Sequence, residues 1–503
     1  MARSILGLQN ATAVFKRKSE VNLKRILISV LIGSLIQANV AVAAANDVAL
    51  PELGDSSSAT FSNQQEYELG RAWLKMFRSQ VRVVSDPLLQ DYMEFLIYKL
   101  ASNSPLKDRR LEVVIVDNPM INAFAVPGGV IGIHNGALLY ADSEAQLASI
   151  LGHELAHLSQ RHFARGVEQQ QKTMLPMMAG MLGALVLAAT ARGDAGIAAM
   201  AATQAAAQQN RLSFSRENEQ EADRIGMETL VKADYDPNAF ASMFENMLAA
   251  NRFAGRNPPE FLLTHPLTES RVSDARNRAR EFPRKVYVDN LDYQLMRARV
   301  EVQLASNNAD ALKKFKARLK GQSRNIEADR YGLALAFLQA GQLQEAHAQL
   351  DPLLQKDSRR LAYIVTDADI DIAAGDNERA IAKLQAQLRV NPGNYPLAMS
   401  YADALLKSGQ PQLAETVLEE QAKARPNDPY VWYELAEMHG LAGNILGVYQ
   451  ARAEYFVLNG VLDKAEQQLN YALKLVKNDE ITTAKINERI RQIKTLKEQM
   501  EKM

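Results

Sequence analysis

Hydrophobic and polar positions follow two different patterns along the chain, and the change occurs between residues 285 and 290. From 290 to 503, apolar residues recur at helical spacing, which predicts a succession of amphipathic helices. From 61 to 285 the pattern is irregular, and short β-rich runs stand between helical stretches. We therefore expect a mainly α protein, with an α+β domain at 61–285 that holds a small sheet and an all-helical domain at 290–503.

The helical part contains an internal repeat of 34 residues. Glycines recur at this spacing, and an alanine stands five residues after each of the first three: Gly341, Gly375, Gly409, Gly443, Ala346, Ala380 and Ala414. A helix-turn-helix unit of this length, with a small residue in its second helix, is the tetratricopeptide pattern. Such units stack into an α-solenoid whose extended surface binds polypeptides. The domain at 290–503 is therefore predicted to bind proteins and to carry no catalytic chemistry.

The first 45 residues have the composition of a secretory signal peptide. Basic residues between 16 and 25 precede the apolar run 26–36, and small residues follow up to Ala45. A membrane anchor is the alternative, but eleven strongly apolar residues are fewer than the roughly 20 that a spanning helix needs. We expect cleavage near Ala45, an exported mature chain and a flexible Ser/Asp/Pro-rich leader at 46–60.

Composition excludes several classes of site and partner. The chain has no cysteine, so disulfide frameworks, thiolate metal sites and cysteine nucleophiles are excluded. The formal net charge is zero, which argues against nucleic acid as a partner. Residues 1–45 hold six Lys or Arg and one Glu, so 52 basic and 57 acidic side chains remain after cleavage. The mature chain is therefore mildly acidic.

The sequence LGHELAHLSQ at 151–160 carries a candidate metal site. Apolar residues at helical spacing predict a helix here, on which His153 and His157 lie four residues apart and face the same way. Two histidines so placed can bind one zinc ion, and Glu154 beside them can act as the general base of hydrolysis. Such pentapeptides also occur in ordinary helices, so a further ligand decides the interpretation.

That ligand does not follow the two histidines directly. A metzincin has Gly three and His six residues after the second histidine, but here those positions hold glutamine and phenylalanine. His162 falls on a different part of the predicted helix, and we interpret it as a surface residue. Downstream, Glu219 and Asp223 share one face of the helix predicted for SRENEQEADRIG. Glu219 can supply a carboxylate ligand, and Asp223 can accept a hydrogen bond from a ligating histidine, which we expect to be His153.

Three motifs together resemble the HtpX and CAAX-prenyl endopeptidase family: His153-Glu154-x-x-His157, Glu219-x-x-x-Asp223 within NEQEADRIG, and THPLTESR at 264–271. The signal peptide and the repeats narrow the resemblance to a periplasmic member. The resemblance implies a gluzincin-type zinc metalloendopeptidase with one Zn²⁺ per chain. It implies an enzyme that degrades misassembled or stalled outer-membrane β-barrel proteins and also assists their assembly. The implied partners are these barrels, the β-barrel assembly machinery and the lipopolysaccharide-transport barrel.

A second interpretation stays open. The chain could act chiefly as a chaperone or binding module built on the tetratricopeptide repeats, with a latent or self-inhibited metal centre. The repeat array favours this alternative, and the complete set of candidate ligands opposes it. Self-cleavage that a chelator blocks would distinguish the two.

The resemblance also implies a role for the β-rich segment 114–139. In the family, the element that corresponds to Asn122, Ala123 and Phe124 forms a strand beside the cleft, where an extended substrate can pair through its backbone. From the residues alone, an ordinary hairpin is the alternative reading. We interpret His134 in the same segment as structural.

His265 has three readings. The first reading is an ordinary loop histidine. The second is a donor to the oxyanion of the tetrahedral intermediate, and the third is a fourth zinc ligand that inhibits the resting enzyme. The resemblance favours a position near the zinc ion, and of the three we expect the regulatory role. Arg271 would then be a supporting or substrate-facing cation.

The segment 174–191 is uncharged over eighteen residues. A transmembrane helix is one reading, but a single span would place Glu219 on the opposite side of the membrane from the two histidines. The run also contains a proline and two glycines and is at the lower limit of spanning length. We expect an apolar helical flap over the cleft that contacts substrate or the membrane surface.

Overall fold

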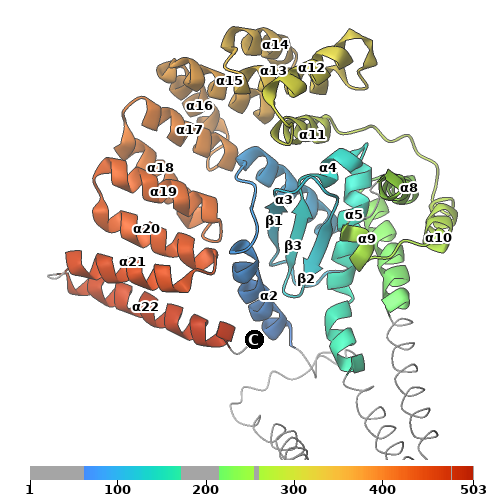
Figure 1. Cartoon of the computed structure of the whole chain (residues 1–503), viewed down its shortest axis with the longest axis horizontal. Helices are drawn as coiled ribbons and strands as arrows, with labels where there is room; N and C mark the ends of the chain where they lie inside the picture. The colour runs from blue at the N-terminus through green and yellow to red at the C-terminus, as the bar shows by residue number, and fades with distance from the viewer. Residues whose placement is uncertain (1–61, 171–214, 254–259, 477–478, 502–503) are drawn as a thin grey trace, which may run out of the picture. The chain divides into compact units, whose positions relative to one another are not determined.

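The computed structural model describes residues 62–170, 215–253, 260–476 and 479–501 (Figure 1). The predicted signal peptide, the predicted leader and the apolar segment 174–191 lie outside these residues. Within the described residues, every helix is too short or too polar to cross a membrane.

A three-stranded sheet forms the centre of the N-terminal domain. Strand β3 (Val130–His134) lies in the middle, parallel to β1 (Glu112–Val116) and antiparallel to β2 (Ala123–Val126). The turn between β2 and β3 contains Gly128 and Gly129, whose φ angles are 80° and 82°, a conformation that side chains other than glycine rarely adopt. The predicted β-rich runs are therefore confirmed, and β2 is an edge strand.

Helices cover both faces of this sheet. Alternate strand residues on one face, among them Ile115 and Ile133, share a core with α3 and α5, while Val114 and Val130 on the other face pack on Leu74 of α2. Residues 162–170 and 215–232 are also helical. The remaining bounds are α2 (Asn63–Arg78), α3 (Pro87–Ser102), α4 (Ala137–Tyr140), α5 (Glu144–Ser159), α8 (Asn238–Phe253), α9 (Glu260–Thr264) and α10 (Glu269–Ala279).

Helix α5 carries the two histidines of the predicted metal site. Ser143 caps its N-terminus by accepting a hydrogen bond from the backbone N–H of Gln146, and its predicted apolar face is buried. The helix crosses residues 215–232 where Gly152 meets Gly226: a Cβ on Gly226 would lie 3.0 Å from the backbone of Gly152 and His153. The two glycines therefore allow the approach that brings acidic side chains of the second helix to the histidines.

The C-terminal part is the predicted array of antiparallel helix pairs (Figure 1). Its elements are α11 (Leu291–Gln303), α12 (Asn308–Ala317), the short π-helix at Arg318–Gln322, α13 (Ile326–Gln339), α14 (Leu343–Lys356), α15 (Leu361–Ala374), α16 (Asn377–Val390), α17 (Tyr395–Lys407), α18 (Pro411–Ala424), α19 (Pro429–Ala442), α20 (Ile445–Leu458), α21 (Leu462–Leu475) and α22 (Glu480–Glu501). The four glycines spaced by 34 residues have positive φ, and the three alanines that follow them are fully buried. The repeat interpretation and the mainly α fold class are confirmed.

The first helix of the array packs directly on the N-terminal domain. The hydroxyl oxygen of Tyr293 on α11 lies 2.9 Å and 2.7 Å from the carbonyl oxygens of Leu138 and Ala141, which share its single proton. Arg299 of the same helix pairs with Asp86, which caps α3. One continuous hydrophobic core runs from α3 to α17. Removal of the array from residue 290 would therefore expose a part of the core of the N-terminal domain.

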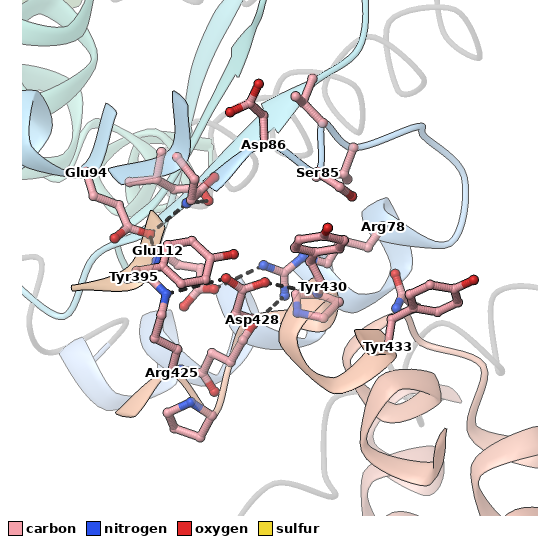
Figure 2. Close-up of a pocket in the computed structure, with 18 of the residues that line it drawn as sticks. Arg78, Ser85, Asp86, Glu94, Glu112, Tyr395, Arg425, Asp428, Tyr430 and Tyr433 are labelled. Carbon is pink, nitrogen blue, oxygen red and sulfur yellow. Dashed lines mark hydrogen bonds and ion pairs between the residues drawn. The ribbon is translucent and has the colours of Figure 1, made fainter. Parts of the chain in front are cut away.

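A second junction encloses a cavity of about 550 Å³ between the β1 edge and helices α17 to α20 (Figure 2). Arg425 lines this cavity, 4.1 Å from the ring centroid of Tyr395 and paired with Glu94 of α3 and with Asp428. The cavity lies at the β1 edge of the sheet, whereas the predicted metal ligands lie beside β2.

Candidate metal centre

Four side chains from three separate segments meet at one point. His153 and His157 lie on α5, Glu219 lies on the helix at 215–232, and His265 follows α9. Each offers one ligand atom, and these four atoms lie within 4.8 Å of one another. The structure therefore brings together the three predicted ligands and the histidine that we expected near them.

The distances between these atoms suit a shared cation. The Nε2 atoms of His153 and His157 are 3.1 Å apart and lie 3.4 Å and 3.5 Å from the carboxylate of Glu219. Nδ1 of His265 is 2.9 Å from Glu219 Oε1 and 3.3 Å from His153 Nε2. The ring of His265 stacks on Phe261, whose carbonyl accepts the hydrogen bond of the His265 backbone N–H.

Asp223 and Arg271 support the ligands from behind. Asp223 Oδ1 lies 2.9 Å from Nδ1 of His153, the ring nitrogen that faces away from the centre. Arg271 donates two hydrogen bonds of 2.7 Å to Asp223, and its Nη1 is 3.0 Å from Glu219. Arg271 is only 6% exposed. These contacts suit the supporting role expected for Arg271, and the substrate-facing role stays a prediction.

Glu154 lies between the histidines and the β2 edge. It is 1% exposed, and its carboxylate accepts a hydrogen bond from the backbone of Ala125 on β2. Its Oε1 is also 3.6 Å from Nε2 of His265. Glu154 is thus held beside the four ligand atoms without being one of them, which is the position expected of a general base.

Burial and opposite charges shift the pKa values of these groups in different directions. Burial lowers the pKa of His153, but the carboxylates of Asp223 and Glu219 outweigh it and raise this pKa above the usual value. Burial raises the pKa of Glu219, but His153 and His265 pull it well below the usual range. Burial lowers the pKa of His157 and raises the pKa of Glu154. The centre therefore stabilises positive charge beside Glu219 and a neutral His157.

This donor set fits a divalent metal ion. Imidazole nitrogens and a carboxylate oxygen are the ligands of catalytic zinc sites in proteins that use no cysteine. His153 also has a carboxylate on its outer nitrogen, the usual arrangement for a ligating histidine. The residues present therefore match the group that they were predicted to hold.

His162 was interpreted as a surface residue, and this is wrong. It is 6% exposed, and its Nδ1 lies 2.8 Å from Nδ1 of His157. The prediction continued the helix of His157 in a straight line, but α5 ends at Ser159 and Arg161 adopts a left-handed conformation with a φ of 52°. The chain therefore changes direction before His162, and no local pattern in the sequence indicates this turn.

The predicted cleft residues 122–124 lie at the start of strand β2. Ala123 is fully buried in the core, and Phe124 packs on Trp73 and Phe77 of α2, on the opposite face of the sheet from α5. The carbonyl of Asn122 accepts a hydrogen bond from the backbone of His134. β2 is an edge strand beside α5, as predicted, and the side chains of Ala123 and Phe124 pack in the core and on α2. His134 is buried on β3, with Nδ1 3.3 Å from the Met120 carbonyl, in agreement with a structural role.

Comparison with known proteins identifies the family. Residues 87–279 match peptidase family M48, and residues 371–437 match a tetratricopeptide repeat. The chain is 36% identical to the beta-barrel assembly-enhancing protease of Escherichia coli (strain K12), over 95% of this chain and 98% of the relative. It belongs to the beta-barrel assembly-enhancing protease family. The member from Yersinia pestis is 34% identical, over 90% of this chain and 93% of the relative.

Membership of this family establishes the enzyme class. The mitochondrial metalloendopeptidase OMA1 of Homo sapiens is also similar, with 28% identity over 42% of this chain and 40% of that protein. The chain is a metalloendopeptidase of peptidase family M48 with a tetratricopeptide array, and the predicted enzyme class is confirmed. Its family implies a divalent metal ion, and His153, His157 and Glu219 form a group that could bind one.

Proposed function

We propose that His153, His157 and Glu219 bind one Zn²⁺ and that Glu154 is the general base of peptide hydrolysis. The observation that carries this proposal is the convergence of the ligand atoms within 4.8 Å, together with the carboxylate of Asp223 behind His153. When bound, zinc polarises the scissile carbonyl and makes an attacking water more acidic.

The protein side chains handle the proton and hold the ligands. Glu154 takes the proton of the attacking water and delivers it to the departing amine. Burial raises the pKa of Glu154, which makes its carboxylate a stronger base. The carboxylate of Asp223, 2.9 Å from Nδ1 of His153, favours a proton on this outer nitrogen, so that Nε2 carries its lone pair toward the centre.

The edge of β2 is the proposed binding site for the substrate backbone. It lies beside α5 and ends close to Glu154, whose carboxylate it contacts through Ala125. An extended polypeptide that pairs with this edge would be held by main-chain hydrogen bonds. Such binding tolerates many sequences, as an enzyme of protein quality control requires.

We infer that the substrates are stalled or misassembled outer-membrane β-barrel proteins and that the enzyme also assists their assembly, in the periplasm. The relatives of E. coli and Y. pestis carry the name beta-barrel assembly-enhancing protease, and residues 1–45 have the pattern of a cleavable signal peptide. The array supplies the surface for the barrels, the β-barrel assembly machinery and the lipopolysaccharide-transport barrel. Contact of the segment 174–191 with the membrane surface belongs to the same proposal.

His265 is the proposed inhibitory ligand. It lies within the group of four potential ligands and follows the short helix α9 in a segment that ends at the cap of α10. A neutral imidazole in the fourth position would remove the open site that hydrolysis requires. Binding of a substrate or partner would then have to move this segment, which needs a difference of a few kcal/mol between two states.

The decisive experiment replaces the proposed base. Glu154→Gln keeps the shape of the side chain but cannot take a proton, so we expect one bound zinc per chain and no cleavage of an unfolded barrel protein. Zinc content and cleavage products are measured on the same preparations. Glu228→Gln is the matched control, because Glu228 is exposed and, among the described residues, pairs across one helical turn with Lys232. Cleavage by Glu154→Gln at the normal rate would refute the mechanism. Retained partner binding without any cleavage, even by the parent chain, would favour the binding-module alternative.

The docking role of the array needs a separate test. Photoreactive amino acids are placed at Leu413 and Leu441, which are 53% and 59% exposed on the array, and at Phe95, which is 65% exposed on α3. In the Glu154→Gln background, we expect capture of barrel or assembly proteins from the array positions and little from Phe95. Equal capture from all three positions would contradict an array-specific surface.

A further inference from the structure

The two histidine ligands are held from behind by different groups. His153 contacts the carboxylate of Asp223 directly, whereas Nδ1 of His157 lies 2.8 Å from Nδ1 of a third histidine, His162. Nε2 of His162 lies in turn 3.1 Å from Oε2 of Glu221. A chain of two imidazole rings therefore connects the centre to a carboxylate on the helix that carries Glu219.

The chemistry of these groups fixes the position of each proton. A carboxylate only accepts hydrogen bonds, so the contact with Glu221 places a proton on Nε2 of His162. A neutral His162 then offers a lone pair at Nδ1, which accepts the Nδ1–H of His157. The remaining nitrogen of His157, Nε2, carries a lone pair toward Glu219 Oε1, 3.5 Å away, and toward the centre. Only this tautomer of His157 is able to bind a metal ion with Nε2.

The backbone conformation before His162 turns its side chain toward His157. Arg161 has a φ of 52°, a left-handed conformation that is costly for residues other than glycine, and it pairs with Glu66 of α2 at 3.4 Å. At the other end, Arg165 donates a hydrogen bond of 2.8 Å to the same Oε2 of Glu221. One ion pair therefore holds the turn before His162, and another holds the carboxylate at the outer end of the chain of rings.

We propose that His162 is a positioning residue that, with Glu221, fixes the tautomer and the ring orientation of His157 for metal binding. The inference rests on the proposed zinc centre and adds a residue to it. His162 acts through His157 and is not among the four potential ligands. The left-handed turn at Arg161 exists in this interpretation to turn His162 inward, which also explains its burial.

His157 is supported through His162 and Glu221, which we call the relay. The relay is longer and more exposed than the support of His153 by Asp223. The side chains of Glu221 and Arg165 are 25% and 37% exposed, against 8% for Asp223 and 5% for Arg271. Solvent screens the outer pair more strongly, so loss of Glu221 should weaken metal binding less than loss of His162. Groups of this kind typically contribute about 10- to 100-fold to metal affinity.

The test measures the dissociation constant for Zn²⁺ alone, by competition with a chromophoric chelator, on the full-length chain. His162→Phe keeps a ring but removes the acceptor, and we expect affinity to fall about 10- to 100-fold. His162→Asn places an oxygen at the position of Nδ1, so it should restore affinity to within a few-fold of the parent. Glu221→Gln should cause a smaller loss, and Glu228→Gln on the same helix should cause none. The d–d spectrum of the Co²⁺-loaded chain should change in His162→Phe and return in His162→Asn.

The outcomes distinguish a failure of the proposed relay from a failure of the proposed metal centre. Zinc affinity of His162→Phe within about two-fold of the parent, or an Asn variant as weak as the Phe variant, would overturn the relay. If the Phe variant does not fold, the comparison of Glu221→Gln with Glu228→Gln decides, since neither change lies in the core. A parent chain that binds no zinc would overturn the proposed centre itself, and the relay with it.

Discussion

The array and the peptidase domain each contain a group of histidine and carboxylate side chains, and the two groups differ in what neutralises them. In the array, ligand atoms of His347, Asp367 and Asp371 lie within the same 4.8 Å limit as those of the peptidase centre. There, however, the ammonium of Lys383 contacts both aspartates, at 2.7 Å from Asp371, and Arg379 also pairs with Asp371. A lysine therefore already occupies the position of a cation.

In the peptidase domain the cations lie behind the carboxylates. Arg271 contacts Asp223 and Oε2 of Glu219, while Oε1 of Glu219 faces His157 and His265. The donor set alone does not make a metal centre. What matters is whether a lysine or arginine reaches the point on which the donors converge, and this depends on packing rather than on residue types.

Metal content gives the largest expected difference between the two groups. His157→Ala should lower bound zinc well below one per chain and abolish peptidase activity, because it removes one of the three ligands proposed for the catalytic site. His347→Ala should leave both zinc content and activity unchanged. Elemental analysis of the dialysed proteins measures this, and loss of zinc from His347→Ala would contradict the comparison.

Removal of His265 should change the activity in the opposite direction. His265→Ala opens the fourth position while His153, His157 and Glu219 remain, so self-cleavage should rise several-fold with zinc still bound. A time course of self-cleavage, with and without a chelator, is the measurement. Lower activity in His265→Ala would instead assign to His265 the role of oxyanion donor.

Loss of Lys383 tests the neutralised group in the array. Lys383→Met removes one of the cations that pair with the fully buried Asp371, beside Arg379 and His347, and breaking a buried pair is destabilising. Because the Lys383 side chain is 35% exposed, we expect a loss of only about 1–2 kcal/mol of unfolding free energy. Urea unfolding measures this loss, with Lys423→Met at an exposed lysine as the control. Equal stability of both variants would show that the pairing of Lys383 contributes nothing.

The smallest effect concerns Asp369 and Asp371 of α15, whose pKa values are shifted in opposite directions. Arg379 and Lys383 outweigh burial and lower the pKa of Asp371, whereas burial raises the pKa of Asp369 to about 6 despite Arg299 and Ser400. The folded state holds the proton of Asp369 more tightly than the unfolded chain, so this residue destabilises the fold as pH rises from about 4 to 6. Asp369→Asn should therefore be more stable at pH 7, by on the order of 1 kcal/mol, and equal to the parent near pH 4. Thermal unfolding of both proteins at pH 7 and near pH 4 checks the sign of this stability difference.

The sequence by itself determined the features that depend on spacing within one element. The 34-residue period predicted the array, because every unit repeats the same local contacts. Residues four apart on a helix must share a face, so His153 and His157, and likewise Glu219 and Asp223, could be grouped before any fold was known. The motif at 264–271 added His265 only through resemblance to a family.

Only the tertiary structure decided how these elements meet. Gly152 and Gly226 let two helices approach closely, the left-handed Arg161 turned His162 toward His157, and Arg271 was buried against Asp223. The same holds for Phe124, which faces α2, and for α11, which joins the core of the peptidase domain. Covalent geometry fixes distances along one helix or strand, but the approach of two elements is set by side chains that are far apart in the sequence, and no local pattern records it.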